Sequence, residues 1–100
     1  MAKPPSGPAR FHALISGRVQ VVGFRAFAEA RALRCGAAGY VRNLSTGQVE
    51  VVAEGDRSLL EEFLADLKKG PRGARVSDVI VNWETPRQEF DDFSVRYDSW

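Results

Sequence analysis

The order in which two kinds of hydrophobic pattern follow each other constrains the fold most. Phe11, Ala13 and Ile15 alternate with other side chains, which is typical of a strand with one buried face, and later segments repeat this pattern. Between them lie two segments whose apolar residues recur at helical spacing. The predicted elements are strands at 10–16, 37–44, 48–55, 76–83 and 93–97, a helix at 24–35, and a helix from Asp56 or Ser58 to Lys69.

This element order predicts the fold class. Strand, helix, strand, strand, helix, strand is the order of a ferredoxin-like, split βαβ sandwich. In this α+β fold, one antiparallel sheet packs against two helices, and here a short extra strand follows. We expect one domain over residues 10–97, a disordered proline-containing leader at 1–9 and a short tail at 98–100.

Composition limits the classes of function. A chain of 100 residues can bury a core without a metal or a disulfide, and its net charge of +1 gives no basic stripe for nucleic acid. No apolar stretch reaches the length of a membrane span, and the single cysteine, Cys35, cannot form an internal disulfide. We therefore expect a cytoplasmic protein that binds neither nucleic acid nor membrane, in which Cys35 is an unreactive thiol.

The segment Gly17–Arg25, between the first strand and the first helix, has the features of a phosphate-binding loop. A loop that enters a helix N-terminus points unpaired backbone N–H groups one way, and the helix dipole adds partial positive charge. Arg25 adds a planar set of donors that matches phosphate oxygens. Taken alone, an arginine at a helix start is more often a surface residue, and Asn43, before a turn, is more often a turn former.

The residue identities resemble the signature of the acylphosphatase family. From Gly17 the loop reads Gly-Arg-Val-Gln-Val-Val-Gly-Phe-Arg, and the family pattern reads Gly-Arg-Val-Gln-Gly-Val-x-(Phe or Tyr)-Arg. The segments 39–43 and 47–51 are similar to the family's strand-turn-strand, whose asparagine corresponds to Asn43. The likeness covers roughly residues 11 to 97, and its further matches are 53–55, 70–71 and 93–97.

The resemblance implies an enzyme that hydrolyses an acyl phosphate to a carboxylate and inorganic phosphate. Water would attack directly, without a covalent enzyme intermediate, a cofactor or a metal, and the protein would act as a monomer on this small molecule. Arg25 and the loop backbone would bind the phosphate, and Asn43 would orient the water. The implied loop residues are Gln20, Val21, Val22, Gly23 and Phe24.

The chemistry of this reaction fits the residues available. An acyl phosphate has a good leaving group, and the charge of a loose phosphoryl transition state lies on the peripheral oxygens. Positioned donors are therefore most of what the reaction needs. With one His and one Cys, the chain offers no recognisable ligand set for zinc.

Two alternatives remain open on the sequence. Val21 stands where the family pattern has a second glycine, and a positive φ there would cost at least about 1–2 kcal/mol, which suggests a catalytically weakened phosphate-binding domain. An RNA-binding domain shares the strand order, but the strand 48–55 has no aromatic for base stacking. We expect structural roles for His12, Glu50 and Glu54, with both carboxylates on the wetter face of the sheet.

Overall fold

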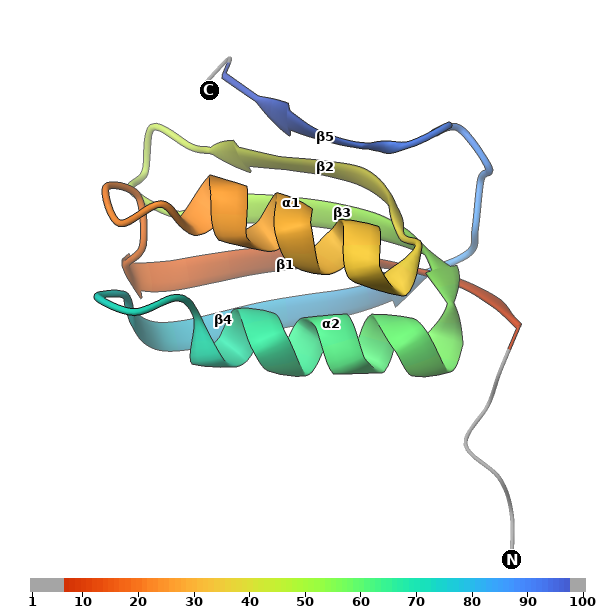
Figure 1. Ribbon diagram of the computed structural model, residues 1–100, viewed down its shortest axis with the longest axis horizontal. Helices are drawn as coiled ribbons and strands as arrows, with labels where there is room; N and C mark the ends of the chain where they lie inside the picture. The colour runs from red at the N-terminus through yellow and green to blue at the C-terminus, as the bar shows by residue number, and fades with distance from the viewer. Residues whose placement is uncertain (1–6, 98–100) are drawn as a thin grey trace, which may run out of the picture.

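The computed structural model describes residues 7–97, which form a five-stranded sheet with two helices packed on it (Figure 1). The elements are β1 (Pro8–Arg18), α1 (Phe24–Cys35), β2 (Ala38–Asn43), β3 (Val49–Asp56), α2 (Arg57–Lys69), β4 (Arg75–Glu84) and β5 (Phe93–Arg96). The strand order across the sheet is β4-β1-β3-β2-β5. The predicted ferredoxin-like α+β fold is confirmed.

The sheet is mixed, so the prediction of a wholly antiparallel sheet is wrong at one edge. β1 pairs antiparallel with β3 and β4, and β2 pairs antiparallel with β3, but β5 runs parallel to β2. The chain leaves β4 at one end of the sheet and crosses that end to the opposite edge (Figure 1). When the chain returns along the opposite edge, β5 runs antiparallel to β4. Because β2 also runs antiparallel to β4, β5 and β2 are parallel.

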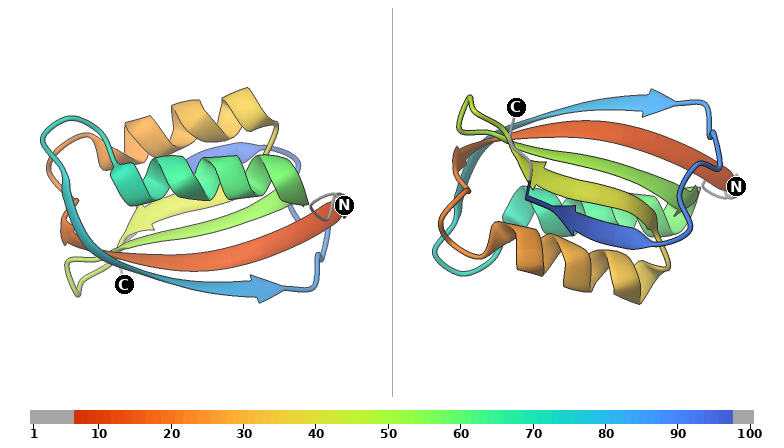
Figure 2. Two further views of the ribbon diagram at one scale, coloured as in Figure 1. Left: turned by 90° about the horizontal axis from the view of Figure 1, so that it is seen from below. Right: turned by 90° about the horizontal axis from the view of Figure 1, so that it is seen from above.

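The two helices lie side by side on one face of the sheet, and no helix formed by residues 7–97 covers the other face (Figure 2). α1 has the predicted bounds, and Gly36 ends it in the left-handed conformation. α2 begins after Asp56, whose side chain accepts a hydrogen bond from the backbone N–H of Leu59, so Ser58 lies inside the helix and is not its cap. The sequence predicts an apolar stripe on α2 that also includes Leu59, but Leu59 is exposed. The buried face consists of the other four members of the stripe: Leu60, Phe63, Leu64 and Leu67.

Aromatic rings join the two layers. Phe11 of β1 is fully buried and lies 6.0 Å from Phe63 of α2 and 5.4 Å from Trp83 of β4, measured between ring centroids. Phe63 also packs at 5.8 Å against Phe93 of β5, with the rings perpendicular. Tilted and edge-on pairs of this kind contribute roughly 0.5–1.5 kcal/mol each beyond their buried area. This cluster connects both edge strands to the centre of the sheet.

β1 begins earlier than predicted. Pro8 and Ala9 pair with Asp56 and Gly55 of β3, so the predicted disordered leader is wrong for these two residues. The backbone N–H of Gly7 donates to Asp56 Oδ1 over 3.0 Å. Pro8 is the first residue of β1, a position at which a strand accepts a proline. Residues 1–6 of the predicted leader and the predicted tail, 98–100, lie outside the described residues.

Glu54 is buried, contrary to the prediction that it lies on a wet face. Only 8% of it is exposed, because Arg10 of β1 and the segment after β4 close over it. Arg10 Nη1 donates to Glu54 Oε2 over 2.6 Å, and the backbone N–H groups of Arg87 and Gln88 donate to the same carboxylate. Burial raises the pKa of Glu54, but these hydrogen bonds outweigh it, so the net pKa lies below its usual value.

Glu54→Gln is expected to lower the free energy of unfolding at pH 7 by about 1–3 kcal/mol, since a buried charged partner of Arg10 is removed. The folded-state pKa of Glu54 is depressed, so its stabilisation is present above about pH 4.3 and is lost as the pH falls through the folded pKa. Urea unfolding from pH 7 to pH 3 should therefore show the variant and the parent converging. The control is Glu61→Gln, whose exposed i,i+4 pair with Arg57 is worth at most about 0.5 kcal/mol; equal losses in both variants would contradict the assignment.

Candidate active site

The loop between β1 and α1 is anchored at both ends. The pairing of β1 with β4 shifts register between Ser16 and Gly17, and a Cβ on Gly17 would collide with the carbonyl oxygen of Arg75. Val19 is 1% exposed and fastens the loop to the core. Gly23 then caps α1 with φ 75° and ψ 24°, a left-handed conformation that glycine adopts without strain. The chain therefore enters α1 from a fixed direction.

The backbone N–H groups of this loop are available to a ligand. Within residues 7–97, the N–H groups from Gln20 to Arg25 make no hydrogen bond, and no side chain caps the helix. The hydrogen bonds of the helix begin with the N–H of Phe27, which donates to the carbonyl oxygen of Gly23 over 3.0 Å. A row of free donors at the positive end of a 12-residue helix favours an anion with several oxygens.

The side chain of Gln20 ties the loop to the turn between β2 and β3. Its Nε2 donates to the carbonyl oxygen of Leu44 over 2.7 Å and to that of Gln48 over 2.8 Å. Gln48 Nε2 in turn donates to Ser16 Oγ over 3.1 Å. Leu44 follows Asn43 directly, so the Gln20 bonds hold the end of β2 beside the loop, as the ribbons also show (Figure 1).

Asn43 offers an unused acceptor at this point. It is the last residue of β2, and its Oδ1 is buried and has no hydrogen-bond partner among the described residues. A buried amide oxygen without a donor costs about 1–3 kcal/mol, and such an atom in a native protein needs an explanation. An ordered water or a ligand donor would satisfy it.

Arg25 lies in a hollow of about 400 Å³ at the start of α1. Its Cζ is 4.7 Å from the ring centroid of Tyr97, so the guanidinium stacks on an aromatic ring. The parallel register of β2 and β5 pairs Arg42 with Arg96, so the next residues along the chain, Asn43 and Tyr97, lie at the same end of the sheet. The hollow is lined by Gln20, Val21, Gly23, Phe24, Arg25, Ala26 and Tyr97.

The predicted site residues are thus brought together in part. Gln20, Val21, Gly23, Phe24 and Arg25 share the hollow, whereas Val22 packs toward the core and Asn43 is joined to the loop through the bonds that Gln20 makes. The sequence reasoning missed Tyr97 as a neighbour of Arg25 and the role of the Gln20 side chain. The signals available were the closing segment that resembles the family terminus and the glutamine within the loop motif.

Val21 adopts an ordinary backbone conformation. Among the described residues, the only positive φ outside glycine belongs to Gln88, at 54°, so the strain predicted for Val21 is absent. The left-handed conformation in this loop falls on Gly23, and the side chain of Val21 points into solvent, 86% exposed. The physical basis of a weakened loop is therefore contradicted.

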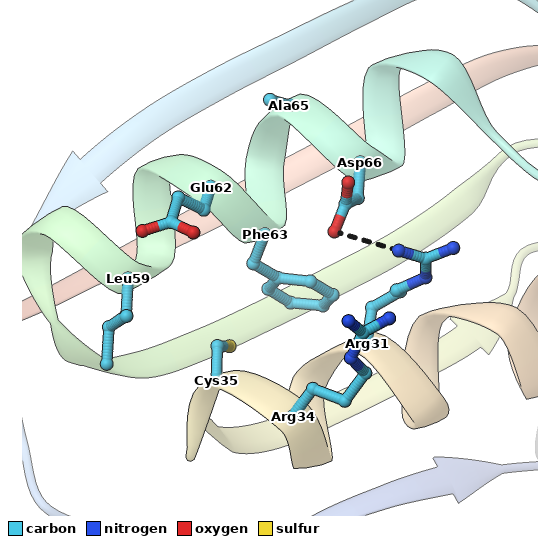
Figure 3. Close-up of a pocket in the computed structure, with 8 residues that line it drawn as sticks. All are labelled: Arg31, Arg34, Cys35, Leu59, Glu62, Phe63, Ala65 and Asp66. Carbon is cyan, nitrogen blue, oxygen red and sulfur yellow. Dashed lines mark ion pairs between the residues drawn. The ribbon is translucent and has the colours of Figure 1, made fainter.

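A second hollow, about 440 Å³, lies between α1 and α2 (Figure 3). It contains Cys35, which is half-buried and donates from Sγ to the carbonyl oxygen of Ala32. Burial raises the pKa of this thiol, so it stays protonated at neutral pH, as expected of an unreactive cysteine. Arg31 and Asp66 form an ion pair across the hollow at 3.6 Å. The other two charged residues that line it, Arg34 and Glu62, are also of opposite sign.

His12 and Glu50 lie on the face of the sheet that carries no helix. His12 Nε2 is 2.8 Å from Glu50 Oε2, and Arg42 Nε donates to Glu50 Oε1 over 2.6 Å. Burial raises the pKa of Glu50, but the hydrogen bonds from His12 and Arg42 outweigh it and lower the net pKa. These partners satisfy the carboxylate, which supports the expected structural role of both residues.

Residues 7–97 contain neither a cluster of metal-ligating side chains nor a helix that could span a membrane. No group of three or more His, Cys, Asp or Glu side chains converges in a way that could bind a metal ion. Neither of the two helices in this range combines the length and the apolar composition needed to cross a membrane.

Comparisons with known proteins agree with the geometry. The acylphosphatase family model matches residues 11–95. A protein named acylphosphatase from Thermus thermophilus is 58% identical over 74 residues, which are 74% of this chain and 84% of that protein. Another from Dehalococcoides mccartyi is 46% identical over 86 residues, or 85% and 94% of the two chains. The crystal structure of acylphosphatase from Bacillus subtilis matches with a TM-score of 0.86 at 34% identity, over 89% of this chain and 99% of that one. With its motif loop, its fold and these relatives in agreement, the chain belongs to the acylphosphatase family.

Proposed function

We propose that this protein hydrolyses acyl phosphates, with water attacking the phosphorus to give a carboxylate and inorganic phosphate. The observation that carries the proposal is the buried Oδ1 of Asn43 beside the N–H donors of the loop, all of them without a hydrogen-bond partner among residues 7–97. The acceptor suits a water, and the donors suit a phosphoryl group. Family membership adds the substrate class, since the named relatives are acylphosphatases.

In this mechanism, the loop N–H groups from Gln20 to Phe24 and the guanidinium of Arg25 bind the peripheral phosphate oxygens. The loop is held by Gln20 and the N-terminus of α1, so its donors need little reorganisation when negative charge spreads over these oxygens. Arg25 contributes a fixed positive charge and a planar fork of donors. Its stacking on Tyr97 limits the rotamers that the side chain can sample.

Asn43 Oδ1 would accept a hydrogen bond from the attacking water and so orient a lone pair of the water oxygen toward phosphorus. Attack and departure in phosphoryl transfer are roughly in line, so the acyl oxygen leaves on the side away from Asn43. The departing carboxylate is a weak base, and its release needs no strong general acid. No metal or cofactor takes part in the proposed reaction.

We further propose that the enzyme acts as a monomer in the cytoplasm on this small substrate. The supporting features are a nearly neutral chain with interspersed charges and a site assembled from β1, α1, β2 and the end of β5 of a single chain. The single cysteine, Cys35, also suits a reducing compartment.

Asn43→Ala is expected to lower kcat for benzoyl phosphate by about 100-fold or more, with a smaller change in KM, because the water loses its orienting acceptor and the phosphate keeps its donors. The assay is steady-state hydrolysis with chelator present. Asn82→Ala, at an exposed position on β4, is the matched control and should behave as the parent. A variant of Asn43 with intact kcat would contradict the assigned role.

Arg25→Lys keeps the positive charge but removes the planar fork. We expect kcat/KM for benzoyl phosphate to fall about 10- to 100-fold, and inhibition by inorganic phosphate to weaken. Arg34→Lys, on the exposed last turn of α1, serves as the control for an arginine outside the loop. If inorganic phosphate inhibits the Arg25 variant and the parent equally, Arg25 does not bind the phosphate.

Val21→Gly is expected to give no increase in kcat, because the valine backbone is unstrained. The added freedom of the unfolded chain should instead lower the free energy of unfolding by about 0.4–1 kcal/mol. Urea unfolding and the benzoyl phosphate assay on the same preparation measure both effects. A large gain in kcat would show that the valine does obstruct the loop.

A further inference from the structure

Two apolar side chains stand exposed at the rim of the hollow that contains Arg25. Val21 is 86% exposed and Tyr97 is 77% exposed, the two highest values among the large exposed hydrophobic residues of the described chain. The others, Leu33, Leu59 and Ile80, lie outside this hollow. The most exposed apolar surface therefore gathers where the proposed phosphate site opens to solvent.

The reaction geometry indicates which part of the substrate meets this surface. The acceptor on Asn43 is buried, so the attacking water lies on the inner side of the phosphate. In-line displacement then directs the acyl oxygen, and the acyl group attached to it, outward to the exposed rim. Val21 and Tyr97 lie on this rim.

Both side chains are also close in the chain or in space to a proposed phosphate contact. The N–H of Val21 is one of the free donors of the loop, so its side chain emerges directly beside the phosphate. The ring of Tyr97 covers Arg25 at 4.7 Å, and a ring used on one face still offers its edge and its other face to a neighbouring group.

We propose that Val21 and Tyr97 form a subsite for the acyl group and make the protein favour acyl phosphates with an aryl or branched alkyl group over acetyl phosphate. This inference rests on the proposed function and names the substrate class of the same site. The motif of the family has a glycine where this chain has Val21, so the contact with the valine side chain is a property of this chain. Burial of apolar surface on both partners supplies the selectivity.

The two residues differ in what their removal does. Val21→Ala removes two methyl groups from the side chain. It keeps the backbone N–H of residue 21, which is proposed to bind the phosphate. Tyr97→Ala also releases Arg25 from its stacking partner, so it is expected to slow the hydrolysis of every substrate. The ratio of kcat/KM for two substrates cancels this shared loss and isolates the acyl contact.

The experiment measures kcat/KM for benzoyl phosphate and for acetyl phosphate in the parent, Val21→Ala, Tyr97→Ala and the control Leu33→Ala. Leu33 is an aliphatic residue 63% exposed on α1 outside the hollow. We expect the ratio of benzoyl to acetyl to fall about 3- to 10-fold in each of the first two variants and to stay unchanged in the control.

The outcomes separate the inference from the function beneath it. A parent that hydrolyses both substrates, with a ratio that neither variant changes, would overturn the subsite and leave the proposed function standing. A parent that hydrolyses neither substrate would overturn the proposed function and the subsite together.

Discussion

The structure depends on β1 being hydrogen-bonded along both of its edges. It pairs with β3 from Pro8 to Ile15 and with β4 from Arg10 to Arg18, so the strand reaches the proposed site almost without freedom to move. The loop begins where this pairing ends, at Arg18. Two residues later, the side chain of Gln20 fixes the loop by its hydrogen bonds to the turn between β2 and β3. Donors held in this way lose little entropy when they meet a transition state, which is the main source of catalysis by positioned groups.

Such a site is kept at some cost to stability. Free N–H groups at the start of α1 and an unpartnered Oδ1 on Asn43 are groups that a protein selected only for stability would satisfy internally. The stabilising interactions lie elsewhere, in the aromatic cluster around Phe11 and Phe63 and in the bonds between Arg10 and Glu54. The fold thus separates the residues that hold it together from those that are left open for a ligand.

The sequence predicted the elements and the loop because these features are local. Apolar spacing and a terminal glycine defined α1 from Phe24 to Cys35, and the motif placed Arg25 in its first turn. Burial of Glu54 could not be predicted in this way, because it depends on Arg10 and on the segment after β4, which are far away in the chain. The contact of Tyr97 with Arg25 likewise depends on the parallel direction of β5, and the relaxed backbone of Val21 depends on Gly23 taking the left-handed turn.

The pairing of β1 with β4 also bears on how the chain reaches its native state. Phe11 lies opposite Trp83 in this pairing, so one hydrogen-bonding edge of the first strand must wait for a partner near the other end of the domain. Contacts of such high sequence separation require a large loop to close before they stabilise anything, and this slows folding. On a ribosome, α1 and the β2–β3 hairpin can form while β1 still has an unpaired edge. The protein is therefore expected to be most prone to aggregation in the interval before β4 is synthesised.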